Sequence, residues 1–167
     1  LFSAATEVGG VISGSDEERI TALYDYGDAL GIAFQIADDL LDYQGDAKAT
    51  GKNVGDDFRE RKLTLPVIKA VADATVEERA FWKRTIEKGD QREGDLEEAM
   101  AILNRHQALE RTRDDAIAWA NRAKEAMGKL PEHEVRRMLI ELADYVVARL
   151  SCTLRRSRTA RSCAWPE

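Results

Sequence analysis

The chain has 167 residues, of which 44% are hydrophobic and 34% charged, a composition ordinary for a soluble domain with one sizeable core. Its formal net charge of −6 argues against nucleic acid as the main partner, because a phosphate backbone selects basic surfaces. No apolar run approaches the roughly 18 residues that cross a bilayer, and no segment resembles a signal peptide. We therefore expect a cytoplasmic protein without stable membrane insertion.

Apolar residues recur at helical spacing along nearly the whole chain, and no segment alternates as a strand does. We predict an all-α fold in which residues 1–13 form the first helix. Ser15 or Asp16 caps the second helix, which runs to about Tyr43 and is long enough to cross a whole domain. A charged, glycine-rich loop is expected at residues 45–62.

The later helices are shorter, and glycine or proline separates them. Thr64 is expected to cap one whose first turn holds Pro66, a position that tolerates proline. Further helices are predicted at residues 76–88, 95–106, 109–127 and 132–150.

We treat residues 1–150 as one portion of a single domain and residues 151–167 as something different. That last stretch contains four arginines, two cysteines and one acid, without helical periodicity. It is predicted to be a disordered or artefactual tail. The alternative is a genuine basic tail that binds a membrane or a partner.

Three aspartates interrupt the second helix where it is otherwise apolar. With about 100° between successive residues, Asp38, Asp39, Asp42 and Gln35 share one arc of the helix. Gly31 falls on the same arc, so we expect open space above the acids. Crowded carboxylates repel one another and lose hydration, and a set of oxygen ligands suits Mg²⁺. The alternative is a solvated acidic stripe that pairs with lysines of a neighbouring helix, and the apolar surroundings disfavour it.

The loop after this helix is typical of a lid over a phosphate group. Gly51 and Gly55 flank Lys52, so that the backbone and an ammonium group can approach an anion closely. Lys62 supplies a second cation at the far end of the loop. Asp56 and Asp57 could support a metal ion indirectly, by contacting the ligands that bind the metal.

These residues resemble a known family. Four ordered segments are similar to the second aspartate-rich region of trans-isoprenyl diphosphate synthases. They are the stretch from Gly31 to Tyr43, Gly51-Lys52, Gly55-Asp56-Asp57-Phe58 and Lys62-Leu63-Thr64-Leu65-Pro66. The similarity covers about residues 1–150 and none of the tail. Within the family, the loop looks most like that of bacterial long-chain enzymes of the octaprenyl or decaprenyl type, which make quinone side chains.

The resemblance implies an all-α isoprenoid-synthase helical bundle around a central cavity. It also implies a transferase, usually homodimeric, that condenses an allylic diphosphate with isopentenyl diphosphate. By the same resemblance, Asp38, Asp39 and Asp42 hold one Mg²⁺ against the allylic diphosphate, and Asp57 supports the metal through water. Asp38, Asp39 and Lys52 are the residues it marks as catalytic.

Substrate contacts are also carried over from the family. Lys52 and Lys62 would contact the allylic diphosphate, and Gln35 with Phe34 would bind and orient the reacting chain. Metal and ammonium charge would stabilise the departing diphosphate, while an apolar cavity would shield the allylic cation from water.

In this family, the first aspartate-rich motif and most of the isopentenyl diphosphate site would lie upstream of Leu1. We therefore expect the chain to be the C-terminal part of a synthase and to be inactive alone. One alternative is a non-catalytic subunit of a heteromeric synthase, although such subunits tend to lose this acid cluster. Others are a terpene cyclase-like lyase, whose Asn/Ser/Glu metal triad is absent from the sequence, and a helical interaction module.

Overall fold

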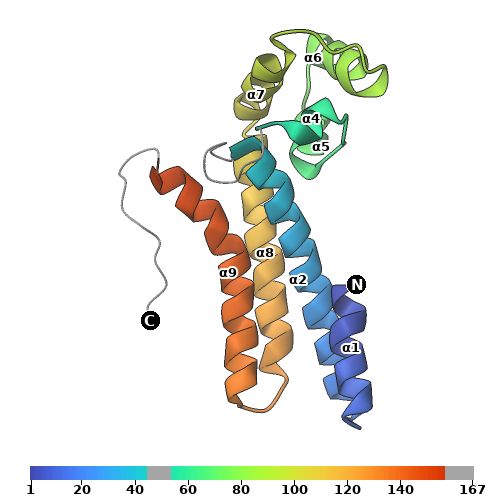
Figure 1. Cartoon of the computed structure of the whole chain (residues 1–167), viewed down its shortest axis with the longest axis vertical. Helices are drawn as coiled ribbons and strands as arrows, with labels where there is room; N and C mark the ends of the chain where they lie inside the picture. The colour runs from blue at the N-terminus through green and yellow to red at the C-terminus, as the bar shows by residue number, and fades with distance from the viewer. Residues whose placement is uncertain (45–53, 157–167) are drawn as a thin grey trace. The chain divides into compact units, whose positions relative to one another are not determined.

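The structure is a computed structural model that describes the backbone of residues 1–44 and 54–156. Every regular element in these two ranges is a helix (Figure 1), so the predicted all-α class is confirmed for the described chain. None of these described helices is both long enough and apolar enough to span a lipid bilayer.

The chain forms two compact units, one made of residues 1–37 together with residues 115 onward and the other of residues 38–114. Two long helices, α2 (Glu17–Gln44) and α8 (Ala108–Gly128), contribute to both units. The acid-bearing end of α2 therefore belongs to the second unit, with the loop and the shorter helices.

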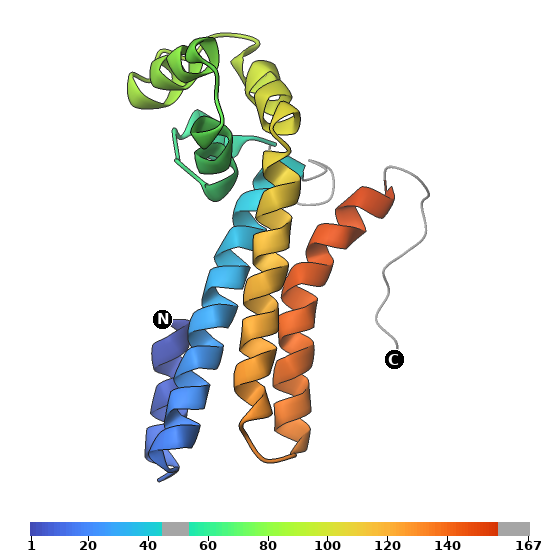
Figure 2. The same cartoon turned by 180° about the vertical axis from the view of Figure 1, so that it is seen from behind.

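In the first unit, α1 (Phe2–Ile12) lies beside α2, and α8 forms an antiparallel hairpin with α9 (Glu134–Arg156) (Figures 1 and 2). Small side chains let these helices approach closely. Buried alanines of the unit are Ala22, Ala29, Ala33, Ala37, Ala116, Ala120, Ala123, Ala126 and Ala143. The buried Tyr26 joins α2 to α9 by donating a hydrogen bond of 2.9 Å to the carbonyl oxygen of Leu139, and burial raises the pKa of Tyr26 to about 12.

Two glycines of α2 allow α1 to pack against it. A Cβ atom at Gly27 would lie 2.3 Å from Thr6 Oγ1 and 2.6 Å from the Phe2 carbonyl oxygen. A Cβ atom at Gly31 would lie 3.2 Å from Cβ of Phe2. The expectation of open space above the acids at Gly31 was therefore wrong, because the missing side chain makes room for Phe2.

Several helix ends differ from those predicted. Asp16 caps α2 as expected, its Oδ1 accepting from the Arg19 amide at 2.9 Å. Thr64 occupies the N-cap position of α5 (Leu65–Ala72), but its hydroxyl makes no capping hydrogen bond. It lies 3.5 Å from the Tyr43 hydroxyl instead. The backbone of α9 continues to Arg156, beyond the predicted end at residue 150, whereas residues 157–167 of the predicted tail lie outside the described chain.

The second unit contains α4 (Asp56–Arg59), α5, α6 (Val76–Trp82), the π-helical turn η1 (Lys83–Glu87) and α7 (Asp95–Arg105). The helix predicted at 76–88 thus changes from α to π geometry midway. The core of the second unit contains a cluster of aromatic rings. The ring centroid of buried Phe58 lies 6.5 Å from that of Phe81 and 6.3 Å from that of Trp82. Because Phe58 belongs to α4, this cluster anchors that short helix to α6.

A buried carboxylate ties α6 to α7. Glu78 is only 5% exposed and accepts a hydrogen bond of 2.8 Å from the Thr75 amide in a capping box. It also pairs with Arg105 and with His106 Nε2, the latter at 2.8 Å. The Thr75 amide and then these side chains lower the pKa of Glu78 to about 2, against the effect of burial. His106 thus helps to hold α6 and α7 together.

Replacing Gly27 by Ala is expected to disrupt the packing of α1 on α2, because the added methyl group overlaps the backbone of Phe2. Overpacking of this kind costs about 1–3 kcal/mol. Gly9→Ala is the matched control: a Cβ there meets nothing within 4 Å, and alanine in a helix stabilises by up to about 1 kcal/mol relative to glycine. Chemical denaturation and hydrogen exchange of the α1 amides measure both effects. Equal protection of α1 in the two variants would contradict the close approach at Gly27.

Candidate functional site

The three acidic residues near the end of α2 lie beside its buried face. Leu40 and Tyr43 are buried, whereas Asp38 is exposed and Asp39 and Asp42 are half-buried. The predicted arc of three acids therefore lies at the edge of the core, where a carboxylate keeps part of its hydration and remains reachable from solvent.

Asp42 fixes the returning end of the loop. The Gly55 amide donates to the Asp42 carbonyl oxygen at 2.9 Å, and the Asp57 amide donates to Asp42 Oδ2 at 3.1 Å. Gly55 has a φ of 81°, and a Cβ there would lie 2.4 Å from Leu96 Cδ1, so glycine is required by both conformation and space. These contacts bring Asp57 next to an acid 15 positions earlier in the chain.

The carboxylates of this site crowd one another. Burial raises the pKa of Asp42, and the negative charges of Asp57 and Asp56 raise it further, while the backbone amides of the same two residues act in the opposite sense. Burial also raises the pKa of Tyr43 to about 12, and the charges of Asp42, Asp57 and Asp39 add to that effect. Both shifts have the sign expected of a region of negative potential, which a cation would relieve.

Lys62 supplies a positive charge at the edge of the acids. Its Nζ lies 2.9 Å from Asp57 Oδ1 and 2.7 Å from Glu60 Oε2. These two carboxylates, with Glu60 the larger cause, raise the pKa of Lys62 above its ordinary value. Hydrogen bonds therefore run from Asp42 through Asp57 to Lys62 in a continuous chain.

The predicted site residues fall into three groups. The structure brings Asp42, Asp57 and Lys62 together by direct hydrogen bonds. Asp38 and Asp39 lie about one turn before Asp42 on α2. Lys52 lies outside the described residues.

Phe34 and Gln35, predicted to bind the substrate chain, belong to the first unit. Both line a hollow of about 500 Å³ between α1 and α2, together with Phe2 and Ile32. The Phe34 ring centroid lies 5.6 Å from that of Phe2, and the Arg149 guanidinium carbon lies 5.1 Å from the Phe34 centroid. Phe34 is thus held from two sides while 37% of it remains exposed.

The donor set fits a hard divalent cation, although it is not a ready-made cage. Among the described residues, no group of three or more carboxylate, imidazole or thiol side chains is close enough to hold a metal ion. Mg²⁺ does not require such a cage, because it commonly keeps several waters and binds through one or two carboxylates and the phosphates of a substrate. The raised pKa of Asp42 indicates carboxylates that a cation would stabilise.

Two contacts of this site were not predicted from the sequence. Glu60 pairs with Lys62, and the Thr64 hydroxyl lies against Tyr43. Residues two apart do not face each other on a helix, so only knowledge of the turn between Glu60 and Lys62 would have revealed their contact. Thr64 was predicted to cap a helix, but its hydroxyl contacts Tyr43 instead of a backbone amide of that helix.

Comparison with known proteins places this site in a family context. Residues 1–103 match the family model described as polyprenyl synthetase. The octaprenyl diphosphate synthase of Escherichia coli strain K12 is 42% identical over 149 residues, a match that covers 89% of this chain and 46% of that protein. The octaprenyl diphosphate synthase of Haemophilus influenzae is 40% identical over 143 residues, covering 86% of this chain and 43% of that protein.

Solved structures with the same fold agree with these matches. A decaprenyl diphosphate synthase from Rhodobacter capsulatus is similar with a TM-score of 0.83 and 66% identity, over 89% of this chain and 46% of that one. A polyprenyl synthase from Caulobacter crescentus CB15, solved with calcium and isoprenyl diphosphate, has a TM-score of 0.80 and 45% identity, over 89% and 45% of the two chains. The chain spans less than half the length of each of these relatives.

Substituting Asp57 by Asn is expected to lower the pKa of Asp42. The substitution removes a repelling charge but keeps the backbone amide that donates to Asp42 Oδ2. NMR titration of the side-chain carboxyl carbons measures the shift, and Asp90→Asn, elsewhere in the unit, serves as the control. An unchanged or raised pKa of Asp42 in the Asp57 variant would show that these two acids do not interact as described.

Proposed function

This chain belongs to the polyprenyl synthetase family, and we propose that the whole protein condenses an allylic diphosphate with isopentenyl diphosphate to make a trans-polyprenyl diphosphate. We propose that residues 1–150 form the C-terminal portion of the synthase domain and that residues 151–167 form a separate tail. The proposal extends to Mg²⁺ as the cofactor, a homodimer as the assembly and the cytoplasm as the location.

The observation that carries this proposal is the hydrogen-bonded chain from Asp42 through Asp57 to Lys62. A diphosphate group needs both a metal, which carboxylates hold, and direct cationic partners. Here burial raises the pKa of Asp42, the negative charges of Asp57 and Asp56 add to that effect, and an ammonium group lies within hydrogen-bonding distance of Asp57.

In the proposed reaction, Asp38, Asp39 and Asp42 would hold Mg²⁺, and Asp57 would support it through water. Mg²⁺, when bound, supplies positive charge that offsets the charge of the diphosphate. As the carbon–oxygen bond of the allylic substrate breaks, both electrons leave with the diphosphate, and the ammonium groups of Lys52 and Lys62 stabilise the added negative charge.

The carbon fragment left behind is an allylic cation. The double bond of isopentenyl diphosphate attacks it, a carbon–carbon bond forms, and loss of a proton restores a double bond in the product. Phe34 and Gln35 would orient the reacting chain in this step. A ring and an amide suit that role, because the ring excludes water from the cation and the amide carries no nucleophilic charge.

A long-chain product is the version of this function that the relatives support best. The decaprenyl diphosphate synthase of Rhodobacter capsulatus is 66% identical to this chain, whereas a short-chain isoprenyl diphosphate synthase of Methanothermobacter thermautotrophicus is 38% identical. We therefore propose a product of the octaprenyl to decaprenyl class, of the kind used as a quinone side chain.

Replacing Asp38 by Ala in the whole protein is expected to reduce turnover by at least about 100-fold, the scale on which loss of a principal electrostatic contributor acts. The assay follows elongation of farnesyl or geranylgeranyl diphosphate with isopentenyl diphosphate and Mg²⁺. Asp114→Ala, an exposed acid of α8, is the control and should retain activity. Turnover close to that of the unsubstituted protein in the Asp38 variant would assign catalysis to other residues, and a folded protein that forms no prenyl product would refute the function.

A further inference from the structure

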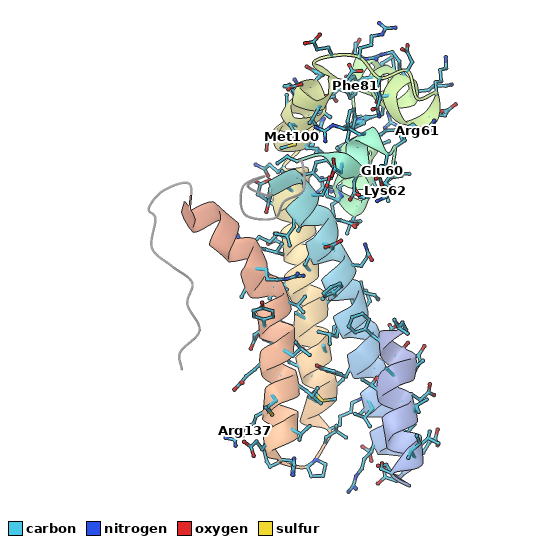
Figure 3. The ribbon with its side chains drawn as sticks, in the orientation of Figure 1. Glu60, Arg61, Lys62, Phe81, Met100 and Arg137 are labelled. Carbon is cyan, nitrogen blue, oxygen red and sulfur yellow. The ribbon has the colours of Figure 1, made fainter. Side chains whose placement is uncertain are left out.

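Glu60 and Lys62 form an ion pair although they are two positions apart. Side chains with that spacing point in different directions on a helix. The contact exists because Arg61, between them, has a φ of 61°, a left-handed conformation that costs energy for any residue other than glycine. Figure 3 shows Glu60 and Lys62 next to each other, with Arg61 farther along toward α6. Unfavourable backbone conformations of this kind cluster at functional sites.

The turn is built as a regular helix terminus. The Arg61 amide donates to the Phe58 carbonyl oxygen at 3.0 Å, and the Lys62 amide donates to the Asp57 carbonyl oxygen at 2.8 Å. This pair of hydrogen bonds ends α4 in the manner of a Schellman motif, with arginine where glycine is usual. A Cβ on Gly89 would lie 2.6 Å from Arg61 Nη1, so the arginine side chain lies directly against that glycine.

The same helix end is fixed from a second direction. Gln91 Nε2 donates to the Phe58 carbonyl oxygen at 2.8 Å, and the Phe58 ring is buried beneath α4. These hydrogen bonds hold the backbone around Lys62, so a change in the partner of the Lys62 ammonium group requires only side-chain movement.

The two carboxylates that hold Lys62 differ in exposure. The Asp57 side chain is 16% exposed, and its backbone amide donates a hydrogen bond to Asp42. The Glu60 side chain is 61% exposed, so its ion pair with Lys62 is formed largely in contact with water. Lys62 thus lies between a mostly buried carboxylate and an exposed one.

We propose that Glu60 is a displaceable counter-ion for Lys62, one that holds the ammonium group beside Asp57 in the ligand-free protein and yields it to an oxygen of an incoming diphosphate. This inference rests on the proposed function of the site. Glu60 acts through Lys62 and is a positioning residue, since it need not touch the substrate.

Electrostatics decide that Glu60 leaves when a diphosphate arrives. A diphosphate oxygen bonded to Lys62 would lie within a few ångströms of the Glu60 carboxylate, and like charges at that distance repel strongly outside bulk water. An exposed ion pair is weak, so it exchanges readily for a multiply charged partner. Glu60 therefore orients Lys62 when no ligand is bound, and its negative charge weakens the binding of the diphosphate to the protein.

Isothermal titration of the protein with inorganic diphosphate in the presence of Mg²⁺ tests this inference. Glu60→Gln is expected to tighten binding about two- to fivefold, the range in which exposed ion pairs act. In a Lys62→Met background the same substitution should have no such effect, because the competition needs the ammonium group. Glu97→Gln, an exposed acid of α7, removes the same charge elsewhere and is the matched control.

The outcomes separate this inference from the function on which it rests. Unchanged or weaker binding by the Glu60 variant, in a protein that does bind diphosphate, would overturn the inference alone. A tightening that persists in the Lys62→Met background would also overturn it, because it would reflect general repulsion. Failure of the unsubstituted protein to bind diphosphate with Mg²⁺ would overturn both.

Discussion

Two hydrogen bonds to Asp42, from the amides of Gly55 and Asp57, determine where the rest of the site lies. They hold Gly55 and Asp57 against the last turn of α2, which carries Asp42. Because α4 begins at Asp56, the same contacts set the position of Asp57 and, through the turn at the end of α4, that of Lys62. Removing them would separate the carboxylates of the site from its described cation.

This arrangement balances charge in a way that suits a diphosphate bound with a metal. Burial raises the pKa of Asp42 and the negative charges of Asp57 and Asp56 add to that effect, while Lys62 is paired with Asp57 and with Glu60. Such a site favours a ligand that brings both positive and negative groups. A metal ion would satisfy the inner acids, and the diphosphate that accompanies it would meet the ammonium group at the edge.

Much of this could be predicted from the sequence, because periodicity and residue type determine it. The helical class, the extent of α2 and the shared face of Asp38, Asp39 and Asp42 follow from periodicity along the chain. Asp57 and Lys62 were proposed from the charges of the loop and then from family resemblance. Other features depend on contacts that spacing does not encode: Phe2 against Gly31, Thr64 beside Tyr43, and Glu60 paired with Lys62 across a left-handed Arg61. In each case, the contact that a residue makes depends on the packing or backbone conformation of other residues, which its own sequence position does not reveal.

Electron paramagnetic resonance of Mn²⁺, a probe for a hard divalent cation with oxygen ligands, would test most directly whether the acids of α2 hold a metal against a diphosphate. Inorganic diphosphate is expected to make Mn²⁺ bind with a resolved coupling to phosphorus, and replacing Asp38 and Asp42 together by Asn is expected to abolish this bound species. Mn²⁺ that binds equally well in the doubly substituted protein, or that shows no phosphorus coupling, would contradict a metal–diphosphate site on these acids.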